Sequence, residues 1–80
     1  MPGVNPQIAT VVLSVSGAHW TKVAMIIARS LRECDAKGIT TTHEEIAALI
    51  DELCEAGQLE SKGNRSDWRH SEVRLRNIKH

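Results

Sequence analysis

"THEEIAALIDELCEAGQLE", residues 42–60, is the stretch that decides the fold of this 80-residue chain. Thr42 and Glu45 form a capping box, in which the threonine hydroxyl accepts from a free helix amide and the glutamate carboxylate reaches back. Apolar residues then recur at helical spacing as far as Gly57, a residue type that closes helices in the left-handed conformation. The stretch predicts a helix over 43–56 that leads directly into a strand at Leu59.

Two further helices are predicted upstream. Asn5 before Pro6 is a helix-start signal, and apolar spacing continues to a stop at Gly17, which predicts a helix over about 6–16. The β-branched content of this segment would also suit a strand. A second helix is expected from Trp20 to just before Gly38, with an apolar stripe of Trp20, Val23, Ala24, Ile27, Leu31 and Cys34. Ile39 and its threonines suggest either a short strand or an extended link.

After Gly57 the spacing of apolar residues along the chain changes from helical to alternating. Leu59 predicts a short strand, Gly63 and Asn64 a turn, and residues 71–77 a second strand. On that strand Val73 and Leu75 should point inward and Arg74 and Arg76 outward, while Trp68 covers an edge of the core. The expected core consists of Val23, Ile27, Leu31, Ile46, Leu49, Ile50, Leu53, Leu59, Val73 and Leu75.

The predicted fold class is α+β, mainly α, in a single domain over residues 1–80. Three helices followed by a two-stranded β-hairpin is the winged-helix order. The chain has no Phe, no Tyr and only two Trp, so the core must be aliphatic. Its apolar runs are too short to span a bilayer, so no membrane passage is expected. No secretory signal pattern is present, and the two cysteines are expected to be reduced thiols of a cytoplasmic protein.

Three segments carry a family resemblance: "HWTKVAMIIARSL" (19–31), "LIDELCEAGQLESKGN" (49–64) and "SEVRL" (71–75). Together they resemble a bacterial domain of unknown function with W-x-K-V-A, L-x-x-x-G-x-L-E-x-x-G and E-V-R-L segments. The resemblance covers roughly residues 20–75. It implies a winged-helix-like fold and no established activity. That domain is often found behind another uncharacterised domain, which this sequence does not include, whereas this sequence carries its own N-terminal helix.

Charge is distributed in three blocks although the formal net charge is zero. Residues 1–32 carry three bases and no acid (+3), residues 33–60 one base and eight acids (−7), and residues 61–80 six bases and two acids (+4). The predicted helix over 43–56 lies in the acidic block and has no Lys or Arg, which disfavours its insertion into the major groove of DNA. Its outward carboxylates are Glu44, Glu45, Asp51, Glu52 and Glu55.

The basic C-terminal hairpin is the better candidate contact surface. Its cations could meet phosphates or an acidic protein surface, and Trp68 could stack on a base. Alternatively, the arginines pair with the acidic helix of the same molecule. The candidate contact residues for a partner or nucleic acid are Lys62, Arg65, Trp68, Arg69, Arg74 and Arg76.

Metal binding and catalysis are not predicted. The cysteines and histidines lack ligand-pair spacing, so no metal or cofactor is expected, and Cys54 is interpreted as a buried thiol. Asp67, His70 and Ser71 are close in sequence, but no glycine-framed nucleophile or phosphate loop accompanies them, so the protein is not expected to be an enzyme. The possible metal ligands considered are Cys34, Cys54, His19, His43, His70 and His80.

The leading functional interpretation is a small non-catalytic interaction module that mediates protein–protein contact or self-association. The predicted first helix is uncharged from Val4 to Ala18 and is expected to leave apolar surface for a protein partner or for a homodimer. The alternative is binding of DNA or RNA through the basic C-terminal hairpin.

Overall fold

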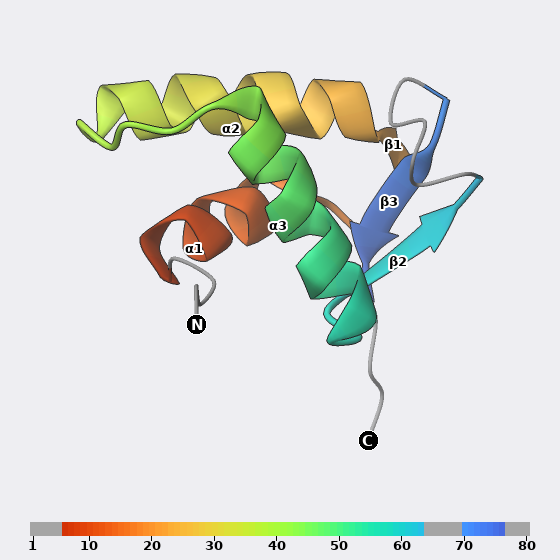
Figure 1. The fold of residues 1–80 in the computed structure, drawn as a ribbon. Coiled ribbons are helices and arrows are strands. Elements are labelled where there is room, and N and C mark those ends of the chain that lie inside the picture. The colour runs from red at the N-terminus through yellow and green to blue at the C-terminus, as the bar shows by residue number, and fades with distance from the viewer. Residues whose placement is uncertain (1–5, 64–69, 77–80) are drawn as a thin grey trace.

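The computed structural model describes residues 6–63 and 70–76 and has an α+β fold that is mainly α (Figure 1). The three helices lie where the sequence predicts them, each within three residues of its expected bounds. In Figure 1, α2 runs across the top, with α1 and α3 beneath it and the sheet to one side. The elements are α1 (Pro6–Val15), β1 (Thr21–Lys22), α2 (Val23–Ala36), α3 (His43–Glu55), β2 (Leu59–Lys62) and β3 (Glu72–Leu75).

The sheet has three antiparallel strands in the order β1-β3-β2, which corrects the predicted two-stranded hairpin. The additional strand comes from the segment that the sequence places in the second helix. Trp20 precedes α2, and Thr21 of β1 pairs with Val73 of β3. The amide of Val23 donates to the carbonyl of Ser71 at 3.0 Å, which joins the start of α2 to the same strand. A two-residue strand is too short to show alternation, so the sequence pattern could not reveal it.

The core is one aliphatic cluster that all three helices and the sheet enclose. Of the ten predicted core residues, eight are buried, whereas Leu31 and Leu75 are partly buried and pack against the cluster. Ile26 is also fully buried, although it is absent from the predicted core. Because the chain has no Phe or Tyr, the core of this small domain is built from the aliphatic residues of all three helices.

The stripe of α1 faces the interior, so the apolar surface that α1 leaves for a partner is limited to its partly buried residues Ala9, Leu13 and Val15. Ile8, Val11 and Val12 are buried, and α1 packs against both α2 and α3. This burial explains why a β-branched segment is helical, since tertiary packing outweighs the weak helix propensity of valine. Of the helices within residues 6–63 and 70–76, none has the length and apolar run that a membrane crossing requires.

The start of α3 confirms the predicted capping box. The Thr42 hydroxyl accepts from the Glu45 amide at 3.2 Å, and Glu45 Oε1 accepts from the Thr42 amide at 3.0 Å. The Thr41 hydroxyl donates to the same carboxylate at 3.0 Å. At the other end, Gly57 has a φ of 83°, the left-handed conformation that its position predicts.

Thr42→Ala is expected to lower the free energy of unfolding by about 1 kcal/mol, because one free amide of the helix start loses its acceptor. Urea denaturation followed by circular dichroism measures the change. Thr40→Ala, on the exposed connector before the cap, is the matched control and should change stability by less than about 0.5 kcal/mol. Equal effects of the two substitutions would contradict the role of the cap.

Candidate functional site

The side of the sheet that faces away from the core carries a tryptophan among alternating charges. The strand register sets Glu60 of β2 opposite Arg74 of β3, and Lys62 of β2 opposite Glu72 of β3. On the other flank of β3, Lys22 of β1 is also opposite Glu72. Because side chains alternate along a strand, the neighbouring positions point the other way, and Leu59 and Val73 among them are buried in the core. We call this surface the outer sheet face; it comprises Trp20, Lys22, Glu60, Lys62, Glu72 and Arg74.

Two cations hold the ring of Trp20. The guanidinium carbon of Arg74 lies 4.5 Å from the ring centroid, and the ammonium of Lys62 lies 4.9 Å from it. Each cation also has a carboxylate: Arg74 Nε donates to Glu60 Oε1 at 2.6 Å, and Lys62 Nζ lies 3.3 Å from Glu72 Oε1. Both cations therefore contact the aromatic ring and an acidic side chain of the neighbouring strand.

These pairs orient side chains more than they stabilise the fold. The side chains of Arg74 and Lys62 are 40% and 55% exposed, so solvent screens both ion pairs. Exposed pairs of this kind contribute at most about 1 kcal/mol, and a cation–π contact at an exposed site adds a similar amount. The result is a surface with an aromatic centre whose side chains are already positioned.

The structure brings together two of the predicted contact residues, Lys62 and Arg74, on this face. Arg76 is exposed and turns toward the C-terminal end of α3, where its Nη1 would lie 3.4 Å from a Cβ placed at Gly57. A cation is favourable there, because the free carbonyls of a helix end carry partial negative charge. Val73 is buried and Leu75 partly buried, as predicted. Arg65, Trp68 and Arg69 lie outside the described residues.

Sequence reasoning missed Trp20, the aromatic residue of this surface, and did not place Lys22, Glu60 or Glu72 on it. The sequence assigned Trp20 to the apolar stripe of a helix because its spacing to Val23 and Ala24 is helical. The available signal was the pair Trp20 and Thr21, since both residue types favour strands. That signal is weak, because two residues cannot show an alternating pattern.

Arg74 pairs with a carboxylate of the sheet, Glu60, and not with the acidic helix that the alternative interpretation named. The carboxylates of α3 stay exposed along its solvent side, and α3 has no lysine or arginine. Glu45 is engaged in the capping box, and Glu44 lies 3.0 Å from His43 Nε2. Among residues 6–63 and 70–76, Arg74 and Lys62 of the outer sheet face therefore pair with carboxylates of the sheet itself.

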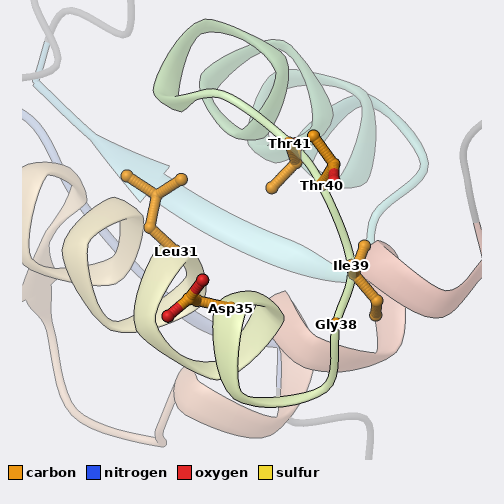
Figure 2. Close-up of a pocket in the computed structure, with 6 residues that line it drawn as sticks. All are labelled: Leu31, Asp35, Gly38, Ile39, Thr40 and Thr41. Atoms are coloured by element: carbon orange, nitrogen blue, oxygen red, sulfur yellow. The ribbon is translucent and has the colours of Figure 1, made fainter.

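A hollow of about 420 Å³ lies beside the connector between α2 and α3 (Figure 2). Among the described residues that line it, Asp35 alone is charged, and the hydroxyl of Thr41 is already bound to Glu45. Figure 2 shows Asp35 and Leu31 on α2 facing the threonines of the connector. This lining lacks the nucleophile and base pair that covalent chemistry needs, so the hollow offers no catalytic arrangement. Its lining residues are Leu31, Asp35, Gly38, Ile39, Thr40 and Thr41.

The Asp67, His70 and Ser71 group does not form an accessible nucleophile. Ser71 is fully buried, and its hydroxyl has no hydrogen-bond partner within residues 6–63 and 70–76. His70 is exposed, and Asp67 lies outside the described residues. A buried hydroxyl cannot meet a substrate, so this group offers no support for catalysis.

No group of three or more potential metal ligands forms among residues 6–63 and 70–76. Cys34 is fully buried, and this burial raises the pKa of its thiol, with the neighbouring Glu33 acting in the same direction. Metals bind the thiolate, so a raised pKa opposes metal binding at this cysteine. Cys54 is partly buried and packs against the core.

A strong chelator is expected to leave the thermal midpoint of unfolding unchanged, and added zinc should not raise it. A structural zinc site supplies much of the folding free energy of a small domain, so its removal would be visible at once. Differential scanning calorimetry with and without excess EDTA checks this. A midpoint that falls by more than a few degrees in EDTA would identify the cysteines and histidines as ligands.

Comparisons of the chain with protein-family models, with curated proteins and with solved structures gave no match. The resemblance to a bacterial domain of unknown function therefore stays a prediction.

Proposed function

We propose that this chain is a non-catalytic protein-contact module with a winged-helix-like fold, and that the outer sheet face is its contact surface. The observation that carries the proposal is the ring of Trp20 held by Arg74 and Lys62 at the centre of that face. Tryptophan and arginine are among the residue types most enriched in the side chains that dominate protein–protein binding energy. The order of the elements, with three helices before the β2–β3 hairpin, supports the winged-helix-like assignment.

The charges of the outer sheet face favour a protein partner over nucleic acid. Its three cations face two carboxylates, Glu60 and Glu72, so the net charge is only +1. A phosphate that approached Arg74 or Lys62 would also meet the carboxylate bound to that cation. A base that stacked on Trp20 would compete with both cations for the ring. A protein surface with its own alternating charges can match this pattern.

Fluorescence anisotropy with labelled duplex DNA and single-stranded RNA across a salt series separates the two functions. The proposal expects no binding at micromolar strength by the wild type, even at low salt. The informative variant is the triple alanine substitution Lys62→Ala, Arg74→Ala and Arg76→Ala. The matched control replaces by alanine three exposed cations outside the strands: Arg29 and Arg32 of α2 and Lys37 at its C-cap.

Nucleic-acid binding at micromolar strength would overturn the proposal under one condition. The slope of the logarithm of the binding constant against the logarithm of salt concentration must be shallower in the Lys62, Arg74 and Arg76 triple variant and unchanged in the control variant. Removal of one phosphate-binding cation should reduce that slope by about one unit. A quantitative pull-down with wild type, Trp20→Ala and the control triple variant tests for a protein partner directly. A partner protein that binds wild type and the control but not Trp20→Ala supports the outer sheet face as the contact surface.

A further inference from the structure

The strand β2 forms one edge of the sheet. Within the described residues only β3 pairs with it, and Figure 1 draws no helix or strand beyond its other side. Ser61 and Lys62 of this strand are exposed. An open edge presents backbone N–H and C=O groups that can pair with a further strand.

The hydrogen-bond pattern shows which backbone groups of β2 face outward. The Arg76 amide donates to the Gln58 carbonyl at 3.2 Å, and these two residues extend the β2–β3 register by one pair. Hydrogen-bonded pairs alternate with non-hydrogen-bonded pairs in an antiparallel ladder. Glu60 and Lys62 therefore turn their backbone groups toward β3, whereas Ser61 turns its N–H and C=O to the open edge.

We propose that β2 pairs with β2 of a second copy of this chain, antiparallel, about a two-fold axis at Ser61. The Ser61 N–H of each copy then donates to the Ser61 carbonyl of the other. The two three-stranded sheets join into one sheet of six strands, and the two outer sheet faces become continuous. This inference goes beyond the proposed function: it adds the edge of β2 as a second contact surface, whose partner is a second copy, beside the outer sheet face.

Charge favours this register over the two neighbouring ones. With the axis at Ser61, Glu60 of each copy lies opposite Lys62 of the other, in a non-hydrogen-bonded pair that brings side chains closest. An axis at Glu60 would oppose two glutamates, and an axis at Lys62 would oppose two lysines. Like charges directly opposite each other are unfavourable. The chosen register continues the alternation of acid and base that already links β2 to β3.

Ser61→Pro tests the backbone part of the inference. The Ser61 amide faces away from β3, so proline should leave the fold intact, while it removes the amide from both copies at once. Sedimentation velocity over a concentration series should show that wild type forms a dimer and that Ser61→Pro raises its dissociation constant at least about tenfold. Ser61→Thr keeps the amide and is the matched control, with an unchanged dissociation constant. Circular dichroism verifies that all three proteins are folded.

A charge exchange tests the register. Glu60→Lys alone and Lys62→Glu alone should each be monomeric, because like charges then face each other across the axis, whereas an equimolar mixture of the two should form a heterodimer. A dimer whose dissociation constant is unchanged by Ser61→Pro would overturn the inference. A wild type that stays monomeric at about 1 mM would also overturn it. Such failure would leave the proposed function standing, because the anisotropy and Trp20→Ala experiments report on the outer sheet face and not on the edge of β2.

Discussion

Leu53→Ala is expected to lower the free energy of unfolding by about 2–5 kcal/mol, the range typical of leucine truncations in a core. Leu53 lies on the buried stripe of α3 and is 4% exposed. The destabilisation combines the transfer free energy of the deleted groups with the cavity that they leave. A domain of this size has a small total stability, so the upper end of the range would leave it largely unfolded at room temperature.

Urea denaturation, extrapolated to water, measures this effect. Glu52→Ala is the matched control, because Glu52 precedes Leu53 on the same helix and is exposed. Alanine is a good helix former, so the control should change stability by less than about 0.5 kcal/mol. A Leu53→Ala protein with an unchanged midpoint would show that the stripe of α3 does not form the core.

Gly63→Ala is expected to cost about 3 kcal/mol, through backbone strain and tight contacts together. Gly63 follows β2 with a φ of 85°, in the left-handed region that disfavours a Cβ. A Cβ at this position would lie 3.2 Å from the carbonyl oxygen of His70 and 3.3 Å from the Cα of Ser71. Both are backbone atoms of the segment that enters β3, so this segment would have to shift by a few tenths of an ångström to accommodate the Cβ.

Gly38→Ala separates the two contributions and is the matched control. Gly38 has a φ of 74°, but a Cβ there would have no neighbour within 4 Å. It should therefore show the strain alone, about 1–2 kcal/mol. Thermal and urea denaturation of both variants provide the comparison. Equal destabilisation by Gly63→Ala and Gly38→Ala would mean that the tight contacts between a Cβ at Gly63 and the start of β3 are relieved without a loss of stability.

The candidate site could be predicted only in part. Lys62 and Arg74 were identified because both are basic and lie on predicted strands, and the outward direction of Arg74 follows from the strand alternation around Val73. Their carboxylate partners required the strand register, which alternation alone does not fix. The ring that both cations contact was assigned to a helix, so the centre of the outer sheet face was missed.

The sequence by itself determined the local elements of this protein. The capping box at Thr42, the left-handed Gly57 at the end of α3 and the helical apolar stripes all depend on residues a few positions apart. These predictions are confirmed except at Trp20, which lies outside α2. Such signals are readable because hydrogen bonds and side-chain contacts within a helix link residues three or four apart.

Only the tertiary structure decided the third strand, the place of Trp20 and the open edge of β2. Thr21 pairs with Val73, which lies far along the chain in β3, and that contact requires the three helices to pack together. The two-residue strand β1 gains its hydrogen bonds from β3 rather than from its own neighbours, so no local pattern specifies it. The register that follows sets which charges face each other and which backbone groups remain at the edge.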